Sequence, residues 1–527
     1  MSSASITPEV QQGNPDSHHF RQHMGRVTGH SAIFFLGTIF NALAAYGFKI
    51  YLARTLGAHL LGIYALGMTI VSITTIFNSL GISQASVRFV SSYTATQRFD
   101  LLRGFLGRSI ALLLVCNGIL AIAMLLVGPW IAVHFYHSTE LAGYMKWFTW
   151  IMGVGVFTAF LGYILAGYKQ VARRTIINNF IGTSSTILLS VLLISTGLGL
   201  KGYLIAQALT GCLTLVLLGA LAWRLTPKPV RSFSGPLAPV DKETVSVATT
   251  TLGLALLGFV MTQTETVALG RFRDPHALGV YALGTAIVAF VCIVLSSVNQ
   301  IFGPTIADLY AREQHDLLSR MYHTLTKWII GLTLPLAAVI MIFSLPIMRI
   351  FGHEFESGWI VLVIGTVGQL VNAGVGSSGT MLYMTGRHRY LIWIQAGVSL
   401  MIVVLNVLLV PRWGIVGAVC TAAIANVAVN TCYLITVRRV LGLFPYDTSY
   451  FRLLLPGVGM LSVLFVIRET FSAIWPAWAT LGASLLLAYV IFLGLALVFG
   501  LNADDKLVAQ MIWARIQSVI FRTEVNA

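Results

Sequence analysis

The chain has 527 residues, of which 57% are hydrophobic and only 10% are charged. Soluble proteins carry about 25% charged residues, so the composition excludes an ordinary soluble domain and predicts many membrane-spanning helices of about 20 residues each. The net charge of +15 does not indicate nucleic-acid binding. The basic residues fall in short segments between apolar stretches, as the positive-inside rule describes.

Taken in chain order, the apolar stretches predict an all-α integral membrane protein with about 14 transmembrane helices. With a cytoplasmic N-terminus, most of the 33 lysine and arginine residues fall in predicted inner segments, which predicts that both termini are cytoplasmic. The predicted spans are 31–53, 60–84, 106–132, 147–167, 175–197, 201–223, 245–269, 277–302, 328–350, 359–384, 390–410, 414–436, 453–470 and 477–500.

One local pattern occurs twice, 217 residues apart. H-L-L-G-I-Y-A-L-G-M-T-I-V begins at His59, and H-A-L-G-V-Y-A-L-G-T-A-I-V begins at His276, with nine of thirteen positions identical. Weaker matches at similar offsets extend the repeat, such as Asp100 with Asp316 and Gly167 with Gly386. A long internal repeat in a membrane protein is typical of two-lobed transporters.

The repeat predicts two pseudo-symmetric six-helix lobes around a central cavity, followed by two additional helices. Because each lobe has an even number of spans, the axis that relates the lobes should run along the membrane normal. The expected parts are a cytoplasmic N-terminal segment (1–30), a first lobe (31–223), a cytoplasmic linker (224–244), a second lobe (245–436), the two additional helices (437–500) and a cytoplasmic amphipathic tail (501–527).

Ionisable residues inside a span are costly and are candidates for function. Lys49 lies in the first span and Glu265 in the seventh, at adjacent equivalent positions of the repeat. The functional interpretation places them on opposite walls of one cavity, where Lys49 attracts an anionic substrate and Glu265 senses a proton or cation. The structural alternatives are an ion pair, or a Lys49 side chain that extends to the membrane surface.

Arg88, at the inner end of the second span, is a further candidate for an anionic head group, or else a positive-inside anchor. Uncharged amides suit sugar hydroxyls in a wet cavity, but amides also join helices. The predicted cavity set therefore adds Asn41, Gln263, Asn178, Gln207 and Asn372.

The residues that recur in both halves are expected to serve architecture rather than substrate binding. Small glycines permit close helix contact and tyrosines add amphipathic rings. This structural set is Arg54, Gly62, Tyr64, Gly67, Arg271, Gly279, Tyr281 and Gly284.

We find no nucleotide-binding, metal-ligand or hydrolase motif, and the five cysteines lie singly within apolar spans. We therefore expect no cofactor and no metal site. The loops between spans are also too short for a catalytic domain, so the chain is expected to be a transporter rather than an enzyme.

Three segments carry a family resemblance. L-A-R-T-L-G-A-H-L-L-G-I-Y-A-L (52–66) with G-I-S-Q-A-S-V-R-F-V (81–90), and E-T-V-A-L-G-R-F-R-D-P-H-A-L-G-V-Y (265–281), resemble the bacterial polysaccharide transporter family of the multidrug/oligosaccharidyl-lipid/polysaccharide flippase superfamily. Glu265 stands where that family usually has aspartate. The resemblance covers the whole chain.

The resemblance implies a flippase that moves an undecaprenyl-pyrophosphate-linked oligosaccharide from the cytoplasmic to the periplasmic leaflet of the bacterial inner membrane by alternating access. It implies lipid-linked oligosaccharide and membrane lipids as partners, a coupling proton or sodium ion, and cooperation with a polysaccharide polymerase and chain-length regulators. The alternatives are a cation-coupled multidrug-type antiporter and an integral-membrane polysaccharide polymerase or ligase.

Overall fold

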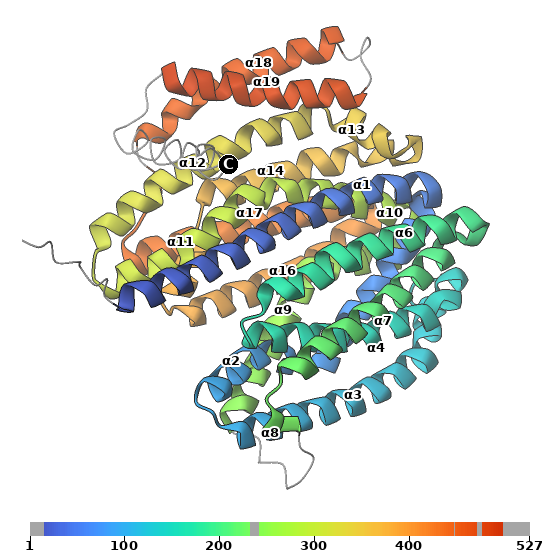
Figure 1. Ribbon diagram of the computed structural model, residues 1–527. Helices are drawn as coiled ribbons and strands as arrows, with labels where there is room; N and C mark the ends of the chain where they lie inside the picture. The colour runs from blue at the N-terminus through green and yellow to red at the C-terminus, as the bar shows by residue number, and fades with distance from the viewer. Residues whose placement is uncertain (1–14, 232–241, 447, 472–476, 499–527) are drawn as a thin grey trace, which may run out of the picture. The chain divides into compact units, whose positions relative to one another are not determined.

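The computed structural model describes residues 15–231, 242–446, 448–471 and 477–498, and every regular element within them is a helix (Figure 1). Eleven helical stretches in this part are long and apolar enough to cross a membrane, which confirms the predicted all-helical membrane fold. The longest of these stretches, 171–225, contains 55 residues and is long enough for more than one crossing. The number of 14 crossings stays a prediction.

The first half of the chain consists of long helices joined by short turns. They are α1 (Pro15–Ser79), α2 (Ile82–Ala95), α3 (Phe99–His134), α4 (Thr139–Gly167), α5 (Val171–Thr175), the π-helix η1 (Ile176–Gly182), α6 (Thr183–Leu193), the π-helix η2 (Ile194–Leu198), α7 (Gly199–Leu225) and α8 (Lys228–Arg231).

The second half repeats this pattern and adds a final pair. Its helices are α9 (Lys242–Phe272), α10 (Pro275–Val288), η3 (Ala289–Cys292), α11 (Ile293–Ala311), α12 (His315–Ile342), α13 (Ser344–Phe351), η4 (His353–Gly358), α14 (Trp359–Val375), α15 (Ser378–Met384), α16 (His388–Trp413), α17 (Ile415–Leu441), η5 (Thr448–Leu453), α18 (Leu454–Phe471) and α19 (Ala477–Val498).

Glycines with positive φ angles interrupt the longest helices. Within α1, Gly57 has φ 77° and ψ 172°, so the chain turns between the first two predicted spans. Gly81, at φ 73°, separates α1 from α2, so the second predicted span ends at Ser79 and not at residue 84. Such backbone angles cost L-residues energy but cost glycine little.

The chain divides into two compact units that differ from the predicted lobes. The first unit contains the described parts of 1–49, 74–125 and 146–252; the second contains 50–73, 126–145 and the described residues from 253 onward. Two segments of the first half therefore pack with the second half. The predicted lobe boundaries stay a prediction, and the predicted tail helix within 501–527 lies outside the described residues.

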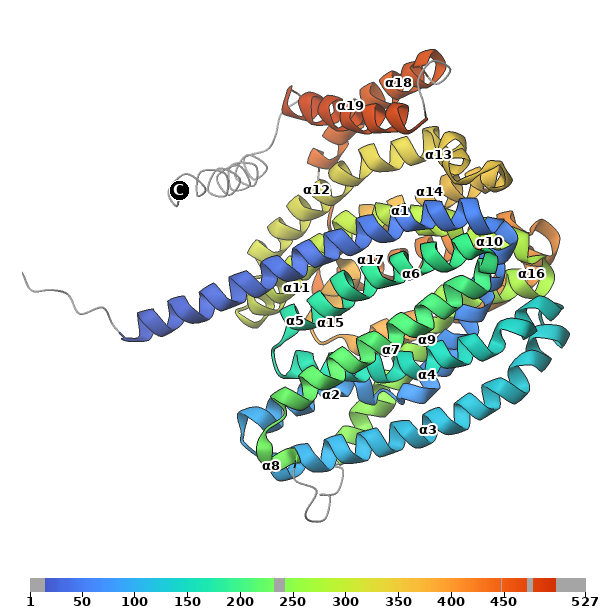
Figure 2. The ribbon, with the colours of Figure 1, turned by 45° about the vertical axis from the view of Figure 1, so that its right-hand side comes forward.

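The core of the second unit includes residues from both halves of the chain. Ala53 and Ala58 belong to the same buried cluster as Val280, Met348 and Phe355. At another place in this unit, α18 and α19 lie side by side and pack against α12 (Figure 2), where Phe343, Met460 and Phe492 are among the buried residues. Large apolar side chains such as Leu486 and Val490 of α19 remain exposed on the outside, because no hydrophobic force opposes that exposure in a membrane.

The break between α14 and α15 is held by buried hydroxyl groups. Tyr322 donates a hydrogen bond to the carbonyl of Val375 (3.2 Å), and Tyr450 donates one to the carbonyl of Gly374 (3.2 Å). These bonds satisfy carbonyl groups that the end of a helix leaves without partners. At Gly376, where φ is 68°, a Cβ atom would overlap the side chain of Thr326.

We expect Gly376→Ala to destabilise the protein more than Gly386→Ala. Both glycines have positive φ angles, of 68° and 76°, but a Cβ atom at Gly386 would meet nothing within 4 Å. The energetic cost of a positive φ angle is thus common to both variants. The overlap with Thr326 should lower the free energy of unfolding of Gly376→Ala by about 1–3 kcal/mol more. Thermal unfolding of the two purified variants measures the difference, and equal midpoints would contradict this account of the helix break.

Candidate functional site

Two equivalent glycines of the repeat make the tightest backbone contact in the second unit. A Cβ atom at Gly62 would overlap the carbonyl group of Pro275, and one at Gly279 would overlap the carbonyl group of Ala58. Ala58 and Pro275 are themselves 217 residues apart, as Gly62 and Gly279 are. The contact is therefore reciprocal, as in an interface with twofold symmetry, and only glycine permits the approach.

The two repeated arginines flank this contact, and each of them bonds to a segment from the other half of the chain. Arg54 donates from Nε to the carbonyl of Ile350 (2.9 Å), which lies between α12 and α14. Arg271 hydrogen-bonds to the imidazole of His137, which lies between α3 and α4. Each arginine thus binds a connection from the other half of the chain.

The repeated histidines complete the pattern within each half. His59 Nε2 lies 3.0 Å from Glu140 Oε2, and His276 Nε2 lies 3.8 Å from Glu354 Oε2. All four side chains are more than 40% exposed, so each pair adds little stability by itself. The two pairs serve to orient the chain, because they hold in place the connections that the arginines and glycines contact.

These contacts form one closed assembly, which we call the outer closure: the residues around Gly62 and Gly279 with the flanking arginine and histidine pairs. The charge distribution predicts that this end of the second unit faces outside. The other repeated residues lie nearby in sequence. Tyr281 and Gly67 are buried, Tyr64 is half-buried, and a Cβ atom at Gly284 would lie 2.9 Å from Val361.

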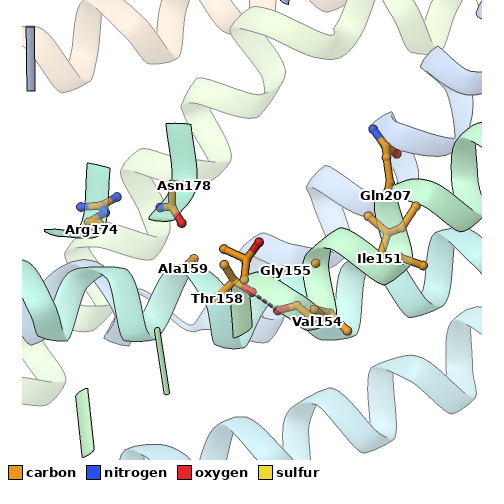
Figure 3. Close-up of a pocket in the computed structure, with 11 residues that line it drawn as sticks. Ile151, Val154, Gly155, Thr158, Ala159, Arg174, Asn178 and Gln207 are labelled. Carbon is orange, nitrogen blue, oxygen red and sulfur yellow. Dashed lines mark hydrogen bonds between the residues drawn. The ribbon is translucent and has the colours of Figure 1, made fainter. Parts of the chain in front are cut away.

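A cavity of about 320 Å³, whose lining includes a cation and several uncharged polar side chains, lies within the first unit between α4, α5, η1 and α7 (Figure 3). Figure 3 shows Arg174 and Asn178 at one end, Gln207 at the other, and Thr158 of α4 between them. The volume is within the usual range for small-molecule sites. Asn178 and Gln207 line this cavity within the first unit, and their place in a central cavity between the lobes stays a prediction.

Arg174 is the one charged residue among those that line this cavity. Its guanidinium lies 5.4 Å from the centre of the Tyr163 ring, a cation–π distance. A Cβ atom at Gly162 of α4 would come within 3.1 Å of Arg174 Nε. The absence of a side chain at Gly162 therefore leaves room for Arg174, which lies on α5. In the sequence, Arg174 falls between the predicted spans 147–167 and 175–197, where the positive-inside rule alone accounts for a basic residue.

Asn178 follows Arg174 by one helical turn, a spacing that places both on one face. The Asn178 Oδ1 atom is buried and has no hydrogen-bond partner among the described residues. It lies in η1, and π-helical turns are frequent at functional sites. An arginine beside amides and a threonine can bind an anionic group that also carries hydroxyls.

Three other predicted cavity amides join helices. Asn41 accepts a hydrogen bond from Thr183 (2.6 Å), and Gln263 accepts one from Thr69 (2.9 Å). Asn372 of α14 donates to the Sγ atom of Cys292 in η3 (3.9 Å). Amides commonly serve in this way in membrane proteins, and a role for these three in a cavity stays a prediction.

The predicted charged candidates differ in environment. Lys49 is half-buried with its Nζ 4.9 Å from the centre of the Tyr46 ring, whereas Arg88 is exposed on α2. Lys49 belongs to the first unit and Glu265 to the second. Their placement on opposite walls of one cavity stays a prediction.

Glu265 of α9 is a buried acid within the second unit. It is 4% exposed and makes a side-chain hydrogen bond with the fully buried Asn406 of α16. The buried Tyr281 of α10 lies close enough to interact with it electrostatically. A carboxyl group held in this way inside a membrane is a candidate for proton or cation binding. Among the described residues, no group of three or more His, Cys, Asp or Glu side chains could hold a metal ion.

Solved structures of transport proteins share this helical arrangement. "Lipid II flippase MurJ, inward closed conformation" is 14% identical, with a TM-score of 0.72 over 89% of this chain and 98% of that chain. An inward-facing multidrug resistance MATE family transporter of the MOP superfamily is 15% identical, with a TM-score of 0.62 over 76% and 95%. The chain is therefore a multi-pass membrane protein with the MurJ/MATE fold.

The family follows from the sequence match. Residues 28–310, more than half of the chain, match the family described as "Polysaccharide biosynthesis protein", and the chain belongs to this family. The capsular polysaccharide biosynthesis protein CapF of Staphylococcus aureus is 22% identical over 187 residues, which are 35% of this chain and 47% of CapF. The chain thus spans about half the length of this curated relative. The match confirms the resemblance found in the sequence.

We expect Gly62→Ala and Gly279→Ala to disrupt the outer closure. Each added methyl would overlap a carbonyl group of the other half, and such overlap with backbone costs about 1–3 kcal/mol. The helices should separate at this end. Labelling of a cysteine introduced at Ala53, which is fully buried in the parent protein, with a membrane-impermeant maleimide should become faster in both variants.

The control for this labelling is Gly143→Ala, because a Cβ atom at Gly143 would meet nothing within 4 Å. Gly143 lies in the second unit, as the two test positions do. If all three alanine variants label at the rate of the parent protein, the closure does not depend on the glycine contact.

Proposed function

We propose that the protein is a flippase that translocates a lipid-linked oligosaccharide from the cytoplasmic to the periplasmic leaflet of the bacterial inner membrane, for surface polysaccharide biosynthesis. The cargo carries an undecaprenyl pyrophosphate anchor. Both termini are cytoplasmic in this proposal, and transport proceeds by alternating access. Membership in the polysaccharide biosynthesis family supports the proposed role in making surface polysaccharide.

The reciprocal glycine contact is the observation that carries the proposal. A polar head group cannot cross about 30 Å of hydrocarbon unaided, so a flippase must enclose it and open to one side at a time. The outer closure joins equivalent segments of both halves through contacts that must separate together. A backbone contact that tolerates no side chain has two discrete arrangements, packed or open, and such elements support switching transitions.

The cavity in the first unit supports a cargo with an anionic group. Arg174 offers a planar guanidinium, which pairs well with phosphate oxygens. Asn178, Gln207 and Thr158 offer both donors and acceptors, which suit sugar hydroxyls. In this proposal the guanidinium contacts the pyrophosphate and the amides contact the first sugars.

A cation-coupled antiporter is the second candidate, and Glu265 favours it. A buried carboxyl group that hydrogen-bonds to Asn406 could bind a proton or sodium ion in exchange for an organic cation. The same residue could instead couple a flippase to an ion gradient. The charge of the cavity distinguishes the two, because Arg174 repels an organic cation and attracts a phosphate.

We expect Arg174→Gln to reduce surface polysaccharide by about tenfold in cells that lack the native copy, because a charge-assisted bond contributes about 1.5–3 kcal/mol. Lipid-linked repeat units should accumulate inside at normal membrane abundance of the variant. Arg173→Gln is the matched control: Arg173 is the neighbouring residue on α5, is exposed and is not among the residues that line the cavity.

Equal polysaccharide from both arginine variants would refute the role of the cavity. If deletion of the whole gene leaves surface polysaccharide intact, the flippase proposal itself fails. Export of organic cations should then be measured in the same strains.

We expect Glu265→Gln to lose transport and Glu265→Asp to retain part of it. Glutamine can still hydrogen-bond to Asn406 but cannot bind and release a proton, whereas aspartate keeps the carboxyl group. The measurement is surface polysaccharide, normalised to membrane abundance, with and without a protonophore. If the glutamine variant is fully active, Glu265 has only a structural role.

A further inference from the structure

A second polar cavity, of about 490 Å³, lies within the second unit between α11, α15, α16 and α17. Its polar lining consists of three carboxamides, a threonine and two tyrosines: Asn299, Gln300, Gln395, Thr380, Tyr383 and Tyr433. None of the nine residues that line it carries a charge. It therefore differs from the first cavity in electrostatics although both are polar.

The two cavities share two equivalent lining positions of the repeat. The spacing of 217 residues relates Asn178 of the first cavity to Gln395 of the second, and both line their cavities. It also relates Arg174 to Leu391, and both of these line their cavities too. Both halves thus have a carboxamide at the first of these positions. At the second position, the cation of the first half is replaced by an apolar side chain in the second half.

The hydrogen-bonding groups of the second cavity are arranged for a ligand. Gln395 donates from Nε2 to the hydroxyl of Tyr433 (3.2 Å), which leaves that hydroxyl able to donate in turn. The Oδ1 atom of Asn299 is buried and has no hydrogen-bond partner among the described residues. An acceptor buried in this way costs about 1–3 kcal/mol unless a ligand or water donates to it.

An aromatic ring completes the site. Tyr383 of α15 is 56% exposed and packs edge-on against His388, with ring centres 5.1 Å apart. At Gly379 a Cβ atom would come within 3.2 Å of the Tyr433 ring, so this glycine lets that ring lie against α15. Aromatic faces present an apolar body beside a polar hydroxyl, which matches the apolar and hydroxylated surfaces of a pyranose ring.

From this geometry we infer that the second cavity is a binding site for an uncharged sugar unit. Carboxamides and phenols both donate and accept, as sugar hydroxyls require, and the site has no cation for a phosphate and no carboxylate for an amine. That the sugar belongs to the transported lipid-linked oligosaccharide rests on the proposed function. The repeat has then produced one cavity suited to an anionic group and one suited to a neutral sugar.

The test uses the full-length protein in nanodiscs of phosphatidylethanolamine and phosphatidylglycerol, free of glycoside detergents. Saturation-transfer NMR with maltose and with N,N′-diacetylchitobiose reports weak binding of neutral disaccharides. We expect transfer to at least one of them, and binding about fivefold weaker or more in Tyr383→Ala and Asn299→Leu. Tyr390→Ala is the matched control, because Tyr390 is exposed on α16 and is not among the lining residues.

Three results would overturn the inference: no transfer to either disaccharide, equal transfer in the parent and in both test variants, or displacement of the disaccharide by an equal concentration of glycerol. The last result would assign the cavity to the glycerol part of a lipid head group. Thermal unfolding of each variant shows whether it is folded, and a second substitution, Gln395→Leu, replaces any variant that is not.

The inference and the proposed function can fail separately. If disaccharide binding depends on Tyr383 but gene deletion leaves surface polysaccharide intact, the site stands and the flippase proposal fails. If deletion traps lipid-linked oligosaccharide inside but Tyr383→Ala and Asn299→Leu bind disaccharide normally, the flippase proposal stands and this site is wrong.

Discussion

The reciprocal contact between Gly62 and Pro275, and between Gly279 and Ala58, is the constraint on which the second unit depends. Two helix beginnings from opposite halves of the chain approach until no side chain fits between their backbones. In a membrane, lipid chains are as apolar as leucine, so close backbone packing replaces the hydrophobic force that holds soluble helices together. The arginine and histidine pairs around the contact then fix its orientation.

This contact also explains the division of the chain into compact units. Residues 50–73 and 126–145 belong to the first half of the sequence but pack with the second half. They supply Arg54, Gly62 and His137 to the outer closure. An element that contacts the other half this closely has few intermediate arrangements, which is the physical property that a two-state transporter requires.

The repeat has kept its architecture and changed its chemistry. The outer closure uses the same residue types in both halves, because both halves must satisfy one symmetric contact. The two cavities are under no such constraint: the position of Arg174 in the first holds Leu391 in the second. Duplication of a bundle thus supplies two cavities that share equivalent lining positions, and a substitution at one such position changes the charge that the cavity presents.

The sequence by itself determined the class of protein, the internal repeat and the segment that mattered most for architecture. Low charge and long apolar stretches require a membrane. The thirteen-residue match identified the glycines of the outer closure, and the two arginines precede it at the same spacing. The family resemblance also followed from these segments and was confirmed. A repeated local pattern is readable in one dimension, because equivalent positions meet the same structural demand.

Only the tertiary structure decided which polar side chains meet. Asn41 and Asn178 are indistinguishable in sequence, yet one bonds to Thr183 and the other lines a cavity with Arg174. The physical reason is that a membrane helix is apolar on every side, so periodicity does not show which face turns inward. The rotation of each helix is set by packing against its neighbours, and those neighbours are distant in the chain.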